Sequence, residues 1–413
     1  MNKFDSFLNA TPVVKKMPAY NPTSHTDGTP NEWAHIEAIT YDGASIGDKK
    51  TKVFAYIGFP AEAATQQVPA IVLVHGGGGH AFAEWVKMWN DRGYAAIAMD
   101  NTGYYPSSAG TGVAGRELDD QALWHPGLRD DFNEEGYTSA PGNDGMFSFD
   151  KPLDQQWMYH AVAGTIMAHN ILRADERVDN TRIGITGISW GGVITSLTIG
   201  YDTRYAFAIP IYGSGYLDIS RGWMVDHFGN EPTKKQWSAA HRFDKVAFPV
   251  LWSCFPDDTP FSVNSNSLSY EDTKVAGAIL SMRQGMGHSH LRGWTPPESF
   301  RFADSIAKDG LPLTACVTEP TGRDFSFEIA VPADATAVTA RIVYITETLS
   351  YSKKKEEDKT VTIDQRWQFA PCAVEGNTVS GILPDEAVDY YVELSTVTPD
   401  NTYITTSRFI EGA

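Results

Sequence analysis

A serine between two glycines is the feature of this sequence best suited to chemistry. Residues 187–191 read Gly-Ile-Ser-Trp-Gly, which places Ser189 at the centre of a Gly-x-Ser-x-Gly pattern. The β-branched run 183–186 precedes this pattern, and the apolar run 193–199 follows it. A strand that turns sharply into a helix lifts such a serine above the edge of a sheet, where its hydroxyl can act as a nucleophile. The alternative is a structural glycine–serine turn between a buried strand and a helix.

A run of four glycines follows a second apolar segment. Residues 70–75 read Ala-Ile-Val-Leu-Val-His and lead into Gly76-Gly77-Gly78-Gly79. Loops of this kind supply backbone N–H groups that stabilise the oxyanion formed during acyl transfer. We therefore predict an oxyanion hole made by the amide of Trp190, one residue after the serine, and the amide of Gly77 or Gly78. Neither a Gly-Lys-Ser/Thr sequence nor the dinucleotide-binding spacing accompanies these glycines, which argues against a nucleotide site.

Two pairs of residues are candidates for the acid and the base that a nucleophilic serine requires. Asp257 and Asp258 follow the apolar run 250–255, and His288 and His290 follow the apolar run 278–282. Each pair lies just beyond a predicted strand, where the ligand sites of open α/β sheets are found. Three or more convergent ligands are needed for a metal, and no compact Cys, His and carboxylate set accompanies the histidines. We predict neither a metal nor a cofactor.

Together these segments resemble the α/β-hydrolase superfamily. More narrowly, they are similar to the bacterial acetyl xylan esterases and dienelactone-hydrolase-like enzymes related to the prolyl oligopeptidase catalytic domain. The resemblance covers roughly residues 30–308, and the order serine, aspartate, histidine is that of the superfamily. It implies that His288, which follows Gly287, is the base and that Asp258, which precedes Thr-Pro-Phe-Ser, is the acid. His290 and Asp257 remain the alternatives for these two roles.

Aromatic residues in two long segments predict the substrate class. The segments 103–151 and 213–248 read as insertions over the active site, and their aromatic residues are mixed with Asp, Asn and Arg. This mixture suits a pocket for a sugar, which has polar edges and apolar faces. Packing under long loops is the alternative role of these side chains. The residues expected to line the pocket are Tyr104, Tyr105, Tyr212 and Trp223.

The resulting prediction is a serine carboxylic-ester hydrolase that acts on short acyl esters through an acyl-enzyme. The expected substrate is a small ester or an acetylated sugar. A prolyl oligopeptidase-like serine peptidase is the first alternative, although about 70 residues before the first core strand cannot form a β-propeller that screens peptides. An inactive hydrolase that serves as a ligand-binding protein is the second alternative.

Composition and charge limit the partners. The net charge of −18 argues against nucleic acid and anionic membranes, whereas neutral substrates are unaffected by this charge. Three widely spaced cysteines do not make a disulfide framework, and a reduced Cys316–Cys372 pair is expected rather than a bridge. Residues 1–20 contain four charged side chains and no continuous apolar stretch, which predicts no signal peptide and a cytoplasmic protein.

The length of 413 residues and a change of pattern near residue 310 predict two domains. Residues 1–310 alternate between strands and helices, which predicts an α/β-hydrolase domain with a mostly parallel sheet flanked by helices. Residues 311–413 contain short alternating runs, which predict an immunoglobulin-like β-sandwich. Because this second domain contains no nucleophile–base combination, we expect no contribution to the chemical step. It should pack on the catalytic domain, shape one rim of the cleft or mediate contacts in a homo-oligomer.

The predicted elements can be stated by residue range. In the catalytic domain, strands are expected at 36–41, 53–59, 70–74, 95–100, 206–211, 250–255 and 278–282, and helices at about 82–92, 154–173 and 297–307. The first two strands are expected to be antiparallel edge strands. In the C-terminal domain, strands are expected at 325–331, 338–346, 361–369, 379–383, 390–395 and 403–410.

Overall fold

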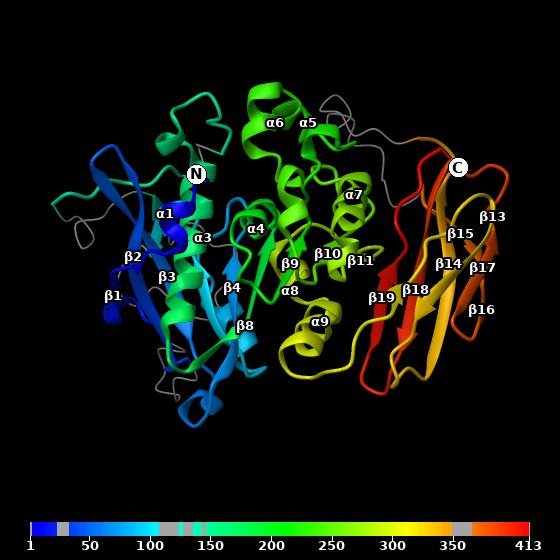
Figure 1. Cartoon of the computed structure of the whole chain (residues 1–413), viewed down its shortest axis with the longest axis horizontal. Coiled ribbons are helices and arrows are strands. Elements are labelled where there is room, and N and C mark those ends of the chain that lie inside the picture. The colour runs from blue at the N-terminus through cyan, green and yellow to red at the C-terminus, as the bar shows by residue number, and fades with distance from the viewer. Residues whose placement is uncertain are drawn as a thin grey trace. The chain divides into compact units, whose positions relative to one another are not determined.

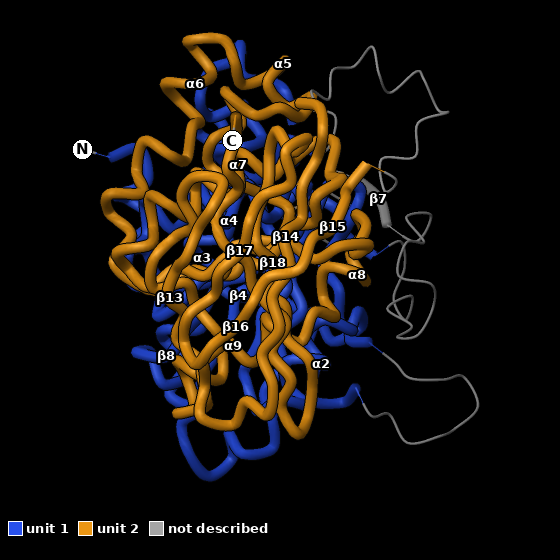
Figure 2. Tube along the Cα trace, turned by 90° about the vertical axis from the view of Figure 1, so that its right-hand side faces the viewer, with its two compact units in different colours: residues 1–208 blue, residues 209–413 orange. Residues whose placement is uncertain are grey.

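A computed structural model describes residues 2–22, 33–106, 124–126, 135–142, 146–348 and 366–412. The chain forms two compact units, residues 1–208 and 209–413 (Figure 2). The division falls within the strand β9 (Phe207–Ile211). This division follows from contacts within the folded chain. The domain boundary predicted at residue 310 comes from a change of sequence pattern and stays a prediction. Among the described residues, no helix is both long and apolar enough to cross a membrane.

The first unit is built on strands in the order β1-β2-β3-β5-β4-β8. Strand β4 runs parallel to β5 and β8, and β1, β2 and β3 are antiparallel to their neighbours. The expected antiparallel pair 36–41 and 53–59 is thereby confirmed, although β1 lies outside it. The bounds of the elements are α1 (Asp5–Leu8), β1 (Val14–Lys16), β2 (Ile36–Ile46), β3 (Lys49–Gly58), β4 (Val68–Val74), α2 (Ala83–Asn90), β5 (Ala95–Met99), β6 (Tyr104–Pro106), β7 (Trp124–Pro126), α3 (Trp157–Ala174), β8 (Val178–Ile188) and α4 (Trp190–Tyr201).

Glycines allow helices to approach both faces of this sheet. A Cβ on Gly58 of β3 would lie 2.8 Å from the side chain of Val86 in α2. A Cβ on Gly164 of α3 would lie 3.3 Å from the side chain of Val53 in β3. Because Val53 and Gly58 are five residues apart in one strand, they face opposite sides. Helices α2 and α3 therefore cover opposite faces of the first unit's sheet, and α3 is seen in Figure 1 in front of β2 and β3.

The second unit contains the end of β9, the strands β10 and β11, and all of the C-terminal strands. Its larger sheet has the order β9-β10-β11-β19-β18-β14-β15, parallel up to β11 and antiparallel beyond it. The bounds of the elements are α5 (Val225–Phe228), α6 (Glu231–Trp237), β10 (Leu251–Cys254), α7 (Val263–Thr273), β11 (Ile279–Met282), α8 (His290–Trp294), α9 (Pro297–Ala307), β12 (Ala315–Cys316), β13 (Asp324–Ala330), β14 (Ala337–Ile345), β15 (Gln368–Pro371), β16 (Ala373–Glu375), β17 (Thr378–Ile382), β18 (Asp389–Val397) and β19 (Thr402–Thr406).

Alternation of buried and exposed residues builds the C-terminal core. In β13, Phe325, Phe327 and Ile329 are buried and the residues between them are exposed, as expected for a strand with one face in water. These side chains belong to one cluster with Ile342 of β14 and Val392 of β18. The four-stranded sheet β12-β13-β17-β16 therefore packs against the larger sheet. The sandwich is consistent with the predicted all-β domain, and its immunoglobulin-like class stays a prediction.

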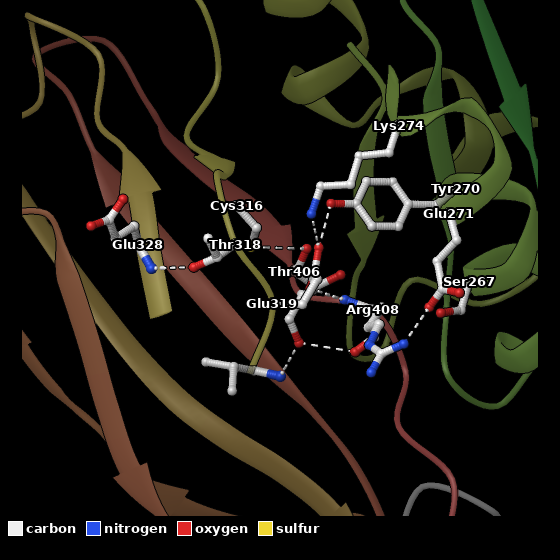
Figure 3. A network of polar contacts seen from close by, with 12 residues as sticks. Ser267, Tyr270, Glu271, Lys274, Cys316, Thr318, Glu319, Glu328, Thr406 and Arg408 are labelled. Atoms are coloured by element: carbon white, nitrogen blue, oxygen red, sulfur yellow. Dashed lines mark hydrogen bonds and ion pairs between the residues drawn. The ribbon is translucent and has the colours of Figure 1, made fainter. Parts of the chain in front are cut away.

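Backbone pairing and a polar network attach the C-terminal strands to the rest of the second unit. Strand β19 pairs with β11 through Leu280 and Thr406. Beside this pairing, the Glu319 carboxylate accepts hydrogen bonds from Tyr270 at 2.7 Å and Lys274 at 2.5 Å, and from the backbone N–H of Arg408 at 2.9 Å (Figure 3). The sandwich is thus continuous with the β10–β11 part of the sheet. All three cysteines are free.

Candidate active site

The predicted nucleophile lies at a strained turn in the first unit. Strand β8 ends at Ile188 and α4 begins at Trp190, so Ser189 occupies the turn between them with φ 57° and ψ −120°. Non-glycine residues rarely adopt positive φ, and such strain is typical of functional sites. The serine is partly exposed, whereas both of its chain neighbours are buried. The local geometry is that of a nucleophile elbow.

Both glycines of the pattern are required by close backbone approach. A Cβ on Gly187 would lie 2.2 Å from the carbonyl oxygen of Gly191. A Cβ on Gly191 would lie 2.0 Å from the carbonyl oxygen of Val74, the last residue of β4. No real Cβ approaches an oxygen so closely, so only glycine allows α4 to begin directly against the end of β4. The spacing of the glycines therefore reflects how the turn folds.

The predicted oxyanion loop lies beside this elbow. A Cβ on Gly77 would lie 2.8 Å from Cδ1 of the Trp190 indole, and Gly78 has φ 72°. The Trp190 ring is buried and packs edge-on against Trp157, with 5.4 Å between the ring centroids. The first unit thus brings together Ser189, Trp190 and the glycine loop. Assignment of the Trp190, Gly77 and Gly78 amides to the oxyanion hole stays a prediction.

The buried His75 supports the glycine loop. Its Nε2 accepts a hydrogen bond from the backbone N–H of Asn101 at 3.0 Å, so its proton is on Nδ1, which donates to the carbonyl of Gly76 at 2.8 Å. The Asn101 side chain donates in return to the carbonyl of His75 at 2.8 Å. Both ring nitrogens are thereby occupied. His75 is a structural residue beneath the loop, a role that its position in the sequence did not indicate.

In the second unit, a hydrogen bond selects one member of each candidate pair. Nδ1 of His288 lies 2.8 Å from Oδ2 of Asp258. The carboxylate is fully buried, and its other oxygen accepts the backbone N–H of Phe261 at 3.1 Å. Burial raises the pKa of Asp258, and the hydrogen bond with His288 opposes part of this rise. A carboxylate on Nδ1 favours the tautomer whose Nε2 can accept a proton.

The alternative residues have different surroundings. Oδ1 of Asp257 accepts the indole N–H of Trp367 at 2.6 Å. His290 is the first residue of α8, and its ring lies 6.3 Å from that of Trp294. Neither residue is part of the Asp258–His288 hydrogen bond. The geometry therefore pairs Asp258 with His288, while their catalytic roles stay predictions.

Tyr212, one of the four residues predicted to line the substrate pocket, contacts this pair within the second unit. Its ring stacks on the His288 imidazole with 4.5 Å between centroids, and its hydroxyl donates to the carbonyl of Gly287 at 2.7 Å. Tyr212 is buried and has φ 63°. Burial raises the pKa of its phenol well above the ordinary value, which keeps the hydroxyl a donor. Tyr212 therefore fixes the base loop (residues 283–289, which include His288), a contact that sequence patterns do not reveal.

The other three predicted pocket residues divide between the units. In the second unit, the backbone N–H of Trp223 donates to the carbonyl of Thr259 at 3.1 Å, so the segment 213–248 contacts the acid loop (residues 255–262, which include Asp257 and Asp258). In the first unit, Tyr105 is buried and Tyr104 is partly exposed. Much of the segment 103–151 lies outside the described residues, namely 107–123, 127–134 and 143–145. Contact of these side chains with substrate stays a prediction.

The structural comparisons return chains with low sequence identity. The acetyl xylan esterase from a Paenibacillus species is 16% identical, with a TM-score of 0.49 over 74% of this chain and 95% of that chain. Acetyl xylan esterase 1 from a Thermoanaerobacterium species is 15% identical, with a TM-score of 0.48 over 74% of this chain and 94% of that chain. The acylaminoacyl peptidase of Pyrococcus horikoshii is 18% identical, with a TM-score of 0.44 over 65% of this chain. The present chain spans 41% of the length of that peptidase.

The sequence comparison with protein families is more specific. No curated protein matches the chain. The family model of acetyl xylan esterase (AXE1) matches residues 3–227, which is more than half of the 413 residues. The matched part contains the glycine loop and Ser189, whereas Asp258 and His288 lie beyond it. The resemblance to acetyl xylan esterases of the α/β-hydrolase superfamily is thereby confirmed, and the chain belongs to the acetyl xylan esterase family.

Proposed function

We propose that the chain is a serine carboxylic-ester hydrolase that removes short acyl groups, acetyl above all, from a carbohydrate. The observation that carries this proposal is the 2.8 Å hydrogen bond between His288 and the buried carboxylate of Asp258. Such a pair is the acid–base half of a serine triad. Membership of the acetyl xylan esterase family and the strained Ser189 turn support it. The net charge of −18 does not hinder a neutral sugar ester.

The proposed mechanism has two halves. In the first, Nε2 of His288 takes the proton of Ser189 as its oxygen attacks the acyl carbon, and the carbonyl oxygen becomes an oxyanion. Backbone N–H groups of Trp190 and of Gly77 or Gly78 stabilise this oxyanion. The imidazolium then protonates the sugar oxygen as its bond to the acyl carbon breaks, which releases the sugar hydroxyl and leaves an acyl-serine. In the second half, His288 deprotonates a water that attacks the acyl-serine, and the imidazolium returns this proton to the Ser189 oxygen as acetate leaves. Asp258 stabilises the imidazolium throughout.

Replacement of the nucleophile tests the proposal. Ser189→Ala should lower kcat for p-nitrophenyl acetate by at least about 10,000-fold, because the triad acts as a unit. The far-UV circular dichroism spectrum should be unchanged, since one hydroxyl is removed at a partly exposed turn. His288→Ala should lose a similar factor, and His290→Ala, the matched control two residues away, should stay within about threefold of wild type. More than a tenth of wild-type activity in Ser189→Ala would show that the nucleophile is another residue.

A substrate panel tests the acyl group and the alternatives. We expect acetyl esters to be cleaved faster than butyryl and octanoyl esters, and acetylated xylo-oligosaccharides to release acetate. Faster cleavage of aminoacyl or peptidyl p-nitroanilides than of these esters would assign the chain to the peptidases. The absence of both a chromophore burst and turnover with every ester would favour the inactive, ligand-binding alternative.

A further inference from the structure

The acid loop is hydrogen-bonded to the C-terminal strands. The indole N–H of Trp367, the residue before β15, donates to Oδ1 of Asp257 at 2.6 Å. Both residues are buried, with 5% and 7% of their surfaces exposed. A hydrogen bond to a buried carboxylate is stronger than one between neutral groups, because burial removes competing water. Since Asp257 directly precedes Asp258, this bond fixes the backbone from which the acid projects.

The base loop has a matching contact. The side-chain amide of Gln284, four residues before His288, donates to the hydroxyl of Tyr391 at 2.7 Å. Tyr391 belongs to β18 and is fully buried. Its ring contacts the Trp367 ring edge-on, with 5.7 Å between centroids. Two touching aromatic residues of the C-terminal strands thus bind the acid loop and the base loop, one each.

These contacts form a closed path. It runs from Asp258 to His288 through their own hydrogen bond, and returns through Gln284, Tyr391, Trp367 and Asp257. This path restricts both loops at once, since displacement of the acid loop must break the buried hydrogen bond of Asp257 and displacement of the base loop the partly buried one of Gln284. A shift of about 1 Å in a reacting group can cost on the order of 100-fold in rate. The separation of Asp258 and His288 therefore depends on residues outside the loops.

We propose that Trp367 and Tyr391 are positioning residues that hold the Asp258 carboxylate and the His288 imidazole at hydrogen-bonding distance. This inference rests on the proposed function, because it assigns the catalytic roles to Asp258 and His288. The two aromatic residues supply no reacting group, which agrees with the expectation that the C-terminal strands take no part in the chemical step. Their effect is on the geometry of the pair.

Other contacts hold the C-terminal strands in place, which makes the proposal testable without unfolding. The Glu319 carboxylate binds α7 through Tyr270, as Figure 3 shows. Arg301 of α9 binds Asp334 through two hydrogen bonds of 2.9 and 2.7 Å. Neither attachment involves a residue of the acid loop or the base loop. Removal of one indole N–H should therefore leave the second unit folded.

The experiment compares Trp367→Phe with Asp334→Asn in the full chain. Phenylalanine keeps an aromatic ring but cannot donate to Asp257, so kcat for p-nitrophenyl acetate should fall about 10- to 100-fold while KM stays within twofold. The acidic limb of the kcat/KM profile should move to lower pH, because a displaced Asp258 stabilises the imidazolium less. Asp334→Asn breaks an attachment away from the loops and should change neither quantity. Tyr391→Phe should lower kcat in the same way and remains informative if Trp367→Phe does not fold.

A double-mutant cycle separates positioning from packing. If Trp367 acts through Asp257, then Trp367→Phe should have little further effect on kcat in an Asp257→Ala background. Independent, multiplying effects would overturn the inference, as would a kcat within twofold of wild type in both Trp367→Phe and Tyr391→Phe. Retained activity in Ser189→Ala would instead overturn the proposed function, so the two failures are distinguishable.

Discussion

The Ser189 turn in the first unit and the Asp258–His288 pair in the second unit are held by different interactions. In the first unit, the Ser189 elbow is set by backbone sterics, because a Cβ on Gly187 or on Gly191 would lie within 2.2 Å of a carbonyl oxygen. In the second unit, side chains from distant segments contact the Asp258–His288 pair and its neighbour, because Tyr212 stacks on His288 and Trp367 donates a hydrogen bond to Asp257. A steric requirement leaves a pattern of glycines in the sequence. A hydrogen bond between residues 110 positions apart leaves none.

The largest loss of activity is expected on substitution of Asp258, the candidate acid of the second unit. Asp258→Asn should lower kcat by about 10,000-fold, because an amide in place of the carboxylate holds the imidazole in the wrong tautomer. Asp257→Asn keeps an oxygen that can accept the Trp367 indole N–H, and should lose less than about tenfold. Steady-state hydrolysis of p-nitrophenyl acetate measures both. A greater loss in Asp257→Asn would exchange the roles of the two carboxylates.

A smaller loss of activity is expected when the close backbone packing at the Ser189 turn is disturbed. Gly191→Ala places a Cβ 2.0 Å from the carbonyl oxygen of Val74, so the start of α4 must move. We expect a loss of at least about 3 kcal/mol in the free energy of unfolding and about 100-fold in kcat. Urea denaturation and ester hydrolysis report the two quantities.

The matched control for this substitution is a glycine of the base loop. Gly285 has φ 69°, and no neighbouring atom lies within 4 Å of the position that an alanine Cβ would occupy there. Gly285→Ala should cost only the strain of a left-handed alanine, about 1 kcal/mol. Equal losses in the two variants would contradict close backbone approach as the reason for glycine at position 191.

The sequence predicted the strands and helices with a clear apolar pattern. The strands β4 and β5, the helix α3 and the alternating strand β13 lie where the pattern placed them. The helix α7 was not predicted, because most of its buried residues are serine and asparagine, which give no apolar period. Ser269 donates to the backbone carbonyl of Ser265 at 2.7 Å and accepts from Gly215 at 2.9 Å. Its polar face is buried only because such partners exist, which no sequence pattern shows.

For the candidate site, the sequence indicated the residues that follow predicted strands, but not the contacts between distant segments. The ends of the predicted strands indicated Ser189 in the first unit and Asp258 and His288 in the second, because side chains that follow parallel strands are expected at one edge of a sheet. Their joint catalytic role stays a prediction. Tyr212 was predicted as a pocket residue, whereas its ring stacks on the base and its hydroxyl binds the base loop. Trp367 was expected within a strand at 361–369, of which residues 361–365 lie outside the described part of the chain. Its bond to Asp257 depends on the fold of the whole second unit, so only the structure could place it there.

The smallest effect on hydrolysis is expected for a substitution in a polar cluster of the first unit. Unlike the Ser189 turn in the same unit, this cluster is held by side-chain hydrogen bonds. The buried Asp202 accepts hydrogen bonds from Arg204 at 2.7 Å and His169 at 2.8 Å, and Arg204 also binds the carbonyl of Leu8. Burial acts to raise the pKa of Asp202, but the hydrogen bonds from Arg204 and His169 outweigh it and hold the pKa well below its ordinary value. Burial lowers the pKa of His169 despite the bond to Asp202.

Both shifts predict loss of stability in acid. A carboxylate whose pKa is lower in the folded state stabilises the fold above the unfolded value, about pH 4, and this contribution disappears as the pH falls through the folded value. A histidine whose pKa is lowered binds its proton more readily when unfolded, which favours unfolding below about pH 6.5. We expect Asp202→Asn to have a melting temperature several degrees lower than wild type at pH 7, with kcat at 25 °C unchanged. Between pH 5 and pH 3, its melting temperature should fall by less than that of wild type. Asp91→Asn, at the exposed end of α2, is the control and should follow the wild-type profile. A steeper fall in melting temperature with acid in Asp202→Asn than in wild type would show that Asp202 binds its proton more readily in the folded state. The carboxylate of Asp202 would then not make the first unit sensitive to acid.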